Sequence, residues 1–262
     1  MRILVTNDDG ITAPGLQVAE EIATEIAGPD GEVWIAAPAF EQSGVSHAIS
    51  FTSPIKVEQL SDRRFAIAGT PADCVIVAVH DLMKDNLPDL VLSGVNRGHN
   101  IAEDAVYSGT VGGAIEAALQ RLPAIALSQY FRRPAASDAP DPDLFSAARN
   151  LGVDAVRRLL ATEWTPDLFY NVNFPPVPAA DAKGFRFAHQ GRRTSGAFGA
   201  ARRASPAGRA YFWLDHRIDN RSAGDGAASK LCAAGYVTAV PMRADYTDYV
   251  VLQKLENAGA DE

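Results

Sequence analysis

The sequence predicts an α/β protein with a doubly wound, mostly parallel sheet. Short apolar runs that suit buried strands recur along the first part of the chain, starting with residues 2–6 and 32–38. A segment with helical periodicity, residues 14–28, separates these two runs. Strands that alternate with helices in this way form a parallel sheet that is covered by helices.

The first helix is expected to end at Gly28, because a glycine followed by Pro29 is a typical helix stop. Its apolar positions recur three or four residues apart and define the face that should pack on the sheet: Leu16, Val18, Ala19, Ile22, Ala23 and Ile26.

Two shorter alternating runs, residues 46–60 and 63–71, predict a β excursion or an edge pair of strands. The next helix is expected over residues 70–83. Thr70 suits the N-cap of this helix, and Pro71 suits its first position.

The alternation of strands and helices then continues to residue 175. A third buried strand is expected over residues 88–94. Residues 132–143, rich in Pro, Ala and Asp, are typical of a surface loop. The other elements expected in this part are helices at 108–122 and 144–163 and strands at 123–128 and 167–175.

After residue 178 the character of the sequence changes. A Gly-, Ser- and Arg-rich stretch, residues 191–209, predicts a mobile arm or a long hairpin. Strand-like runs and a closing helix surround it, at 184–190, 209–215, 235–241 and 246–259. We therefore expect an α/β domain over residues 1–178 and a β-rich C-terminal extension over residues 179–262.

The composition is that of a globular protein: of 262 residues, 47% are hydrophobic and 21% charged. The formal net charge of −8 argues against nucleic-acid binding, which usually requires a basic surface. Neither a signal peptide nor an apolar run of about 18 residues is seen, so no membrane association is expected. Cys74 and Cys232 have no metal or disulfide spacing, which favours buried thiols and a cytoplasmic location.

Polar side chains follow three of the expected strands. Asp8 and Asp9 come after the first strand, and Ser43 lies in the loop after the second. Asn96 and Asn100 follow the strand at 88–94. Because ligands of open parallel sheets bind at the carboxyl ends of the strands, we expect these side chains at one edge of the sheet.

Oxygen ligands of this kind suit a hard divalent cation such as Mg²⁺ or Mn²⁺. Two carboxylates about 4 Å apart repel by roughly 4 kcal/mol at an effective dielectric constant near 20, and a cation would offset this repulsion. Zn²⁺ usually takes His or Cys ligands, and none has zinc-site spacing here. The alternative for Asp8-Asp9-Gly10 alone is a turn in which an aspartate caps the next helix.

The segment Ser108-Gly109-Thr110 begins an expected helix. Free N–H groups at a helix N-terminus bind phosphate, and a glycine there lets a ligand approach closely. The alternative is ordinary N-capping. Arg97 as a phosphate ligand and His99 as a general acid are further candidates, and for each the alternative is a structural role in its loop.

Absent motifs argue against several enzyme classes. The chain has no P-loop and no G-x-G-x-x-G after the first strand, which disfavours NTPases and dinucleotide-dependent enzymes. It also lacks the G-x-S-x-G elbow of Ser-His-Asp hydrolases.

The string RILVTNDDGITAPGL at residues 2–16 closely resembles the start of the SurE family, the stationary-phase survival nucleotidases. The resemblance continues, in the same order, through APAFEQSGVSHAIS, GTPADCV, SGVNRGHN, YSGTVGGAIEA and NVNFP. The chain departs from the family pattern at Ala117, at residues 227–228, and at Val240 and Met242, so the C-terminal third is the diverged part.

The resemblance implies a Rossmann-like α/β domain with a C-terminal extension that builds homodimers or homotetramers. It implies a metal-dependent phosphomonoesterase acting on nucleoside 5′- and 3′-monophosphates and, in some members, on short polyphosphate. The family's ligands for one divalent cation per subunit correspond to Asp8, Asp9, Ser43 and Asn96. Its phosphate site corresponds to Asn100, Ser108, Gly109 and Thr110.

The resulting hypothesis is hydrolysis of a nucleoside monophosphate, with Asp8 and Asp9 as the catalytic residues. We favour a metal-activated water as the nucleophile, because the D-x-D pattern of aspartyl-phosphate enzymes is absent. Two alternatives stay open. One is a metal-dependent transferase with a phosphorylated donor, and the other is a non-catalytic nucleotide-binding protein.

Overall fold

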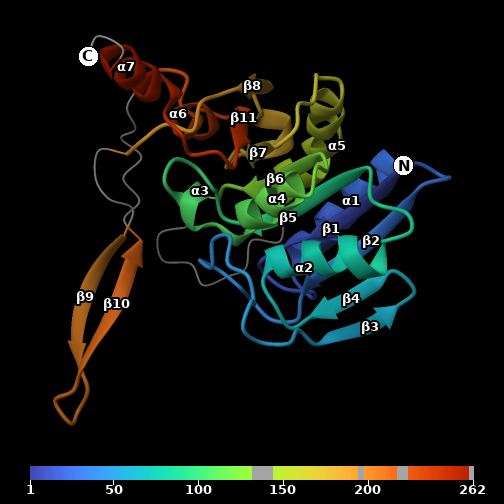
Figure 1. Cartoon of the computed structure of the whole chain (residues 1–262), viewed down its shortest axis with the longest axis horizontal. Coiled ribbons are helices and arrows are strands. Elements are labelled where there is room, and N and C mark those ends of the chain that lie inside the picture. The colour runs from blue at the N-terminus through green and yellow to red at the C-terminus, as the bar shows by residue number, and fades with distance from the viewer. Residues whose placement is uncertain (132–143, 194–197, 217–223, 260–262) are drawn as a thin grey trace.

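The computed structural model of the chain describes residues 1–131, 144–193, 198–216 and 224–259. The expected surface loop at residues 132–143 lies outside this part. A nine-stranded sheet forms the centre of the molecule (Figure 1), in the order β3-β4-β2-β1-β5-β6-β7-β11-β8. Its strands are β1 (Arg2–Thr6), β2 (Glu32–Pro38), β3 (Val57–Ser61), β4 (Arg64–Ile67), β5 (Leu90–Arg97), β6 (Ala124–Gln129), β7 (Leu168–Phe174), β8 (Phe185–Phe187) and β11 (Val237–Arg243).

The strands in the middle of this sheet are parallel. β1 pairs with β2 and β5 in this direction, and β6 pairs in the same way with β5 and β7. Antiparallel pairs join β3 to β4 and β11 to β7. The predicted doubly wound, mostly parallel α/β fold is therefore confirmed. The division of the chain at residue 178 stays a prediction, and β8 and β11 belong to the same sheet as β1.

Helices cover both faces of the sheet. Because side chains alternate along a strand, Ile3 and Val5 pack into the core beneath α1 and α5, whereas Leu4 packs into the core beneath α2 and α4. The helices are α1 (Pro14–Ala27), α2 (Pro71–Val77), α3 (Asp104–Tyr107), α4 (Gly109–Leu119), α5 (Ser146–Leu160), α6 (Ala228–Ala233) and α7 (Tyr249–Gly259).

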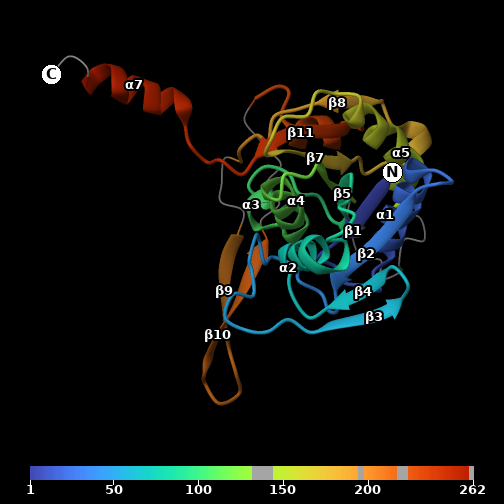
Figure 2. The same ribbon diagram turned by 45° about the vertical axis from the view of Figure 1, so that its right-hand side comes forward.

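Two elements project from the body of the molecule in both views (Figures 1 and 2). One is an antiparallel hairpin of β9 (Phe198–Ala204) and β10 (Ala210–His216), so the Gly/Ser/Arg-rich stretch contributes to a long hairpin. The other is α7. It begins three residues later than expected, because the Asp248 carboxylate accepts hydrogen bonds from the N–H groups of Val250 and Val251 and so caps the helix.

Other elements also differ from the sequence-based expectation, and the short helices α3 and α6 were not expected. The helix expected at 70–83 is α2 followed by a π-helical turn at Ala78–Leu82. The run at 46–60 contributes only to β3. β5 continues past residue 94, because after a shift in register β6 offers pairing partners for Asn96 and Arg97. In the part of the chain that the structure describes, no helix has both the length and the apolar character needed to cross a membrane.

Candidate functional site

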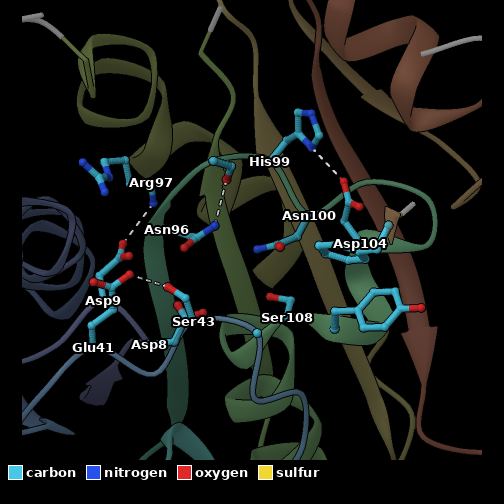
Figure 3. Close-up of a pocket in the computed structure, with 14 residues that line it drawn as sticks. Asp8, Asp9, Glu41, Ser43, Asn96, Arg97, His99, Asn100, Asp104 and Ser108 are labelled. Carbon is cyan, nitrogen blue, oxygen red and sulfur yellow. Dashed lines mark hydrogen bonds and ion pairs between the residues drawn. The ribbon is translucent and has the colours of Figure 1, made fainter. Parts of the chain in front are cut away.

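A pocket of about 230 Å³ opens at the carboxyl ends of β1 and β5 (Figure 3). Gly109 and Thr110 lie directly behind it, against Asp8. The other predicted site residues all line the pocket, although they come from segments far apart in sequence: Asp8, Asp9, Ser43, Asn96, Asn100 and Ser108. The fold thus brings together the polar loops that follow separate strands.

Asp8 is the most deeply buried acid of the pocket, with 4% of its surface exposed. Burial raises the pKa of its carboxyl from 3.8 to about 7, and the hydrogen bond that Thr110 Oγ1 donates to Oδ1 (2.5 Å) opposes this only in part. The negative charge of Asp9 raises the pKa further. A positive charge beside this carboxyl would therefore favour its ionised form.

Asp9 lies next to it and is held by the backbone of β5. Its Oδ2 accepts a hydrogen bond of 3.0 Å from the N–H of Arg97. Burial raises the pKa of Asp9, and the negative charge of Glu41 acts in the same direction, while the N–H and the charge of Arg97 lower it. Both adjacent acids are thus shifted toward the protonated form.

The turn that presents the two acids does not depend on their side chains. Asn7 Nδ2 donates to the carbonyl of Gly10 (2.9 Å), and the N–H of Gly10 donates back to Asn7 Oδ1 (3.2 Å). Gly10 has φ +103°, which only glycine adopts without strain. The N-cap of α1 is Ala13, with no side-chain cap, so neither aspartate serves as the helix cap that was the alternative.

The loop after β2 brings a third acid that the sequence analysis missed. Glu41 lines the pocket, and its Oε1 accepts a hydrogen bond of 2.7 Å from Ser43 Oγ (Figure 3). The N–H of Gln42 donates to the carbonyl of Asp8 (2.7 Å), which ties this loop to the turn after β1. The closeness of Glu41 to Ser43 in sequence was the one signal that pointed to it.

Asn96, at the end of β5, leaves its side-chain oxygen free for a ligand. Its Nδ2 donates to the carbonyl of Gly98 (3.0 Å), and the oxygen points to the side where Asp9 and Ser43 lie (Figure 3). A carbonyl oxygen beside carboxylates suits a hard cation.

Asn100 is buried in a network of amide side chains at the ends of neighbouring strands. Its Nδ2 donates to Ser128 Oγ (2.8 Å), and its N–H donates to Asn173 Oδ1 (2.8 Å). Asn171 Nδ2 donates to its carbonyl (2.7 Å). The network fixes the chain at the pocket wall, and the role of Asn171 and Asn173 was not expected from the sequence.

The start of α4 lies against the first acid. Ser108 Oγ accepts the N–H of Val111 (3.1 Å) as an N-cap, so its own O–H remains available as a donor. Thr110 donates its hydroxyl to Asp8. Gly109 leaves no room for a side chain, since a Cβ there would lie 2.8 Å from the Cβ of Asp8.

His99 lines the pocket from the loop between β5 and α3. Its Nδ1 is 3.3 Å from Asp104 Oδ2 (Figure 3), and its ring packs edge-to-face on Tyr130. Asp104 also pairs with Arg193, whose side chain is only 3% exposed. Arg193 is therefore committed to this buried pair.

The cation donors predicted from the sequence are two of the pocket's carboxylates, Asp8 and Asp9, with neutral oxygens. Among the described residues, no group of three or more His, Cys, Asp and Glu side chains has the arrangement of a metal centre. A cation here would rely on Asp8 and Asp9 together with the oxygens of Ser43 and Asn96. This set fits Mg²⁺ or Mn²⁺ and does not fit Zn²⁺.

Comparisons with known proteins all point to one protein family. A family model described as "Survival protein SurE" matches residues 3–204. A protein of Roseobacter denitrificans named 5′-nucleotidase SurE is 53% identical over 261 residues, covering 97% of this chain and 98% of the relative. A protein of Cereibacter sphaeroides with the same name is 54% identical over 260 residues, covering 98% of each chain.

A solved structure of a protein with the same family name has a similar fold. The crystal structure of the SurE protein from Aquifex aeolicus superposes with a TM-score of 0.81 at 31% sequence identity. The match covers 99% of this chain and 100% of the other. The similarity therefore includes the C-terminal part of the chain, where the sequence motifs diverge most.

Proposed function

The chain belongs to the SurE family, and on this premise we propose that it is a metal-dependent phosphomonoesterase that hydrolyses nucleoside 5′- and 3′-monophosphates. The name 5′-nucleotidase of its relatives supports this reaction. The pocket supports it independently, because it combines oxygen ligands for a cation with a helix start that suits phosphate.

One observation carries the proposal: Asp8 lies against the N-terminus of α4, with Asp9 next to it in the chain. Thr110 Oγ1 is 2.5 Å from Asp8 Oδ1, and Ser108 lines the same pocket. A helix N-terminus attracts phosphate, whereas two carboxylates repel it. A divalent cation between the acids and the phosphate resolves this conflict, and no other ligand class does so as simply.

Asp8, Asp9, Ser43 and Asn96 are the residues that would hold the cation. When bound, a divalent cation in such a site supplies Lewis acidity toward a phosphoryl oxygen and lowers the pKa of a coordinated water. Mg²⁺ and Mn²⁺ fit the donors best, since all are oxygens.

The other residues act on the substrate or on the acids. The hydroxyl of Ser108 and the start of α4 bind the phosphoryl oxygens, and the same groups would take short polyphosphate. Thr110 holds one oxygen of Asp8, which suits a fixed carboxylate better than an attacking one. We therefore propose water as the nucleophile, with Asn100 completing the phosphate end of the pocket.

Product analysis in ¹⁸O-labelled water tests the reaction type. We expect AMP to give adenosine and inorganic phosphate that carries one ¹⁸O atom, and tripolyphosphate to release labelled phosphate more slowly. A transferase would instead move the phosphoryl group to an added alcohol and leave the label in water, which would contradict the proposal.

Gly109→Ala is expected to lower kcat/KM for AMP roughly ten- to a hundredfold, because the new methyl group displaces the Asp8 carboxylate. The matched control is Gly113→Ala, in the same helix. Its methyl group would meet Ser93 Oγ at 2.8 Å, away from the acids, so it should lower the melting temperature and retain activity. Equal activity in the two variants would contradict the assigned role of Gly109.

We also propose that the chain forms a homodimer or homotetramer through its C-terminal extension. The two projecting elements expose large apolar side chains that a monomer would leave in water: Tyr211, Phe212, Trp213 and Leu214 in β10, and Val250, Val251 and Leu255 in α7. Light scattering after size exclusion should give a mass of two or four chains, and Trp213→Glu should lower it. A monomeric wild-type protein would contradict this proposal.

The cytoplasm is the compartment that we propose for this protein. Cys74 and Cys232 are both buried as free thiols, which agrees with a reducing environment.

A further inference from the structure

Two aromatic side chains line the pocket next to its phosphate end. Tyr107, the last residue of α3, directly precedes Ser108, and Phe198 is the first residue of β9. Their ring centroids are 5.0 Å apart and their planes make an angle of 77°, so the rings pack edge-to-face. Tyr107 is 46% and Phe198 42% exposed, so much of this aromatic wall is open to a ligand.

Polar contacts of Arg193 tie the segment before the hairpin to Glu103 and to Asp104, the first residue of α3. The N–H of Arg193 donates to Glu103 Oε1 (2.9 Å), and its Nη1 donates to Asp104 Oδ1 (2.7 Å). In both overall views the base of the hairpin lies beside α3 (Figures 1 and 2). Arg193 is therefore anchored at α3, the helix that also carries Tyr107.

The aromatic wall differs in chemistry from the rest of the pocket. The other lining side chains are carboxylates, amides, hydroxyls and basic groups, which suit a cation and a phosphate. A nucleoside monophosphate also has a flat aromatic base, one sugar away from its phosphate. Every base has a π face, so stacking on Phe or Tyr adds affinity for all of them.

We propose that Tyr107 and Phe198 form the base subsite of this pocket, with the nucleobase stacked against their rings while the phosphate lies at Ser108 and the start of α4. The inference rests on the proposed function, because it assigns the base of the same substrate. Recognition is through the face of the base, so AMP, GMP and CMP all use the wall.

The test compares AMP with ribose 5-phosphate, which has the sugar and the phosphate but no base. Phe198→Ala should raise KM for AMP roughly five- to thirtyfold and leave KM for ribose 5-phosphate and both kcat values unchanged. Phe198→Tyr should keep the wild-type KM for AMP. Phe51→Ala is the matched control, because Phe51 is an exposed phenylalanine outside the pocket lining.

Two outcomes overturn the inference while the proposed function stands. An equal loss on both substrates assigns Phe198 to the fold, and an unchanged KM for AMP shows that the base does not contact the ring. If the wild-type protein releases no phosphate from either compound, the proposed function fails, and calorimetry with AMP then decides the inference by itself. An at least fivefold weaker Kd in Phe198→Ala supports it, whereas an equal Kd, or no binding to the wild type, overturns it.

Discussion

Replacing Asp8 by Asn is expected to lower metal-dependent phosphate release from AMP by at least about a hundredfold. The substitution keeps the shape of the side chain and removes the negative charge that would hold the cation. Thr110 can still donate its hydrogen bond to the remaining amide oxygen, so the fold should be retained. Initial rates at saturating Mn²⁺ measure the effect, and circular dichroism checks the fold.

The matched control for this variant is Asp89→Asn. Asp89 is a carboxylate just before β5, where it accepts the N–H of Arg2 (2.7 Å), and thus lies at the amino end of the strand. It should keep its activity because it is remote from the pocket. Full activity in Asp8→Asn would remove the basis of the assigned metal site.

The metal-free protein is expected to lose stability as the pH rises from about 4 to about 7. Because the pKa of Asp8 is raised from 3.8 to about 7, the folded state binds more protons than the unfolded state in this range. The free energy of unfolding therefore falls with rising pH, by up to about 4 kcal/mol for this group. Asp9, whose pKa is also raised, adds to the same trend.

Urea unfolding in EDTA at pH 4.5, 6 and 8 measures this effect for the wild type and for Asp8→Asn. Other titrating groups cancel in the difference between the two proteins, which should grow with pH in favour of the variant. Mn²⁺ should restore stability to the wild type at pH 8, since a ligand of the folded state stabilises it by mass action. A difference that does not change with pH would contradict the burial of an ionisable carboxyl at position 8.

The parallel sheet could be predicted from the sequence, and so could the position of the polar loops at one edge of that sheet. Both follow from local patterns: apolar runs such as residues 2–6 mark buried strands, and parallel strands present their carboxyl ends at one edge. The contacts between these loops could not be predicted in the same way. The hydrogen bond of Thr110 to Asp8 joins residues 102 positions apart, and no periodicity carries that information.

Two glycines inside α4 lower the stability of the helix, and the packing of another segment explains why they are there. Gly112 and Gly113 weaken a helix, and the sequence alone indicates only that something must approach closely. In the structure a Cβ at Gly112 would collide with the backbone oxygen of Ser46. His47 Nε2 and Glu116 Oε2, 2.8 Å apart, join the same two segments, so the loop that carries Ser43 is held against α4.

The aromatic wall was missed for a similar reason. Tyr107 stands in the sequence only as part of the motif YSGT, and Phe198 lies in a stretch whose Gly, Ser and Arg content predicts a mobile arm or a long hairpin. The two rings pack edge-to-face although their residues lie far apart in sequence, and no local pattern carries that information. The composition of this stretch is compatible with a hairpin, but it does not predict that Phe198 lies at the pocket.

Phosphate release from AMP by the purified wild-type protein, with Mn²⁺ and then with EDTA, tests the central claim most directly. The account predicts steady release of phosphate and adenosine with Mn²⁺, loss of that release in EDTA, and recovery when the cation is returned in excess. Release that persists in EDTA, or no release from any nucleoside monophosphate with Mn²⁺ or Mg²⁺, would contradict it.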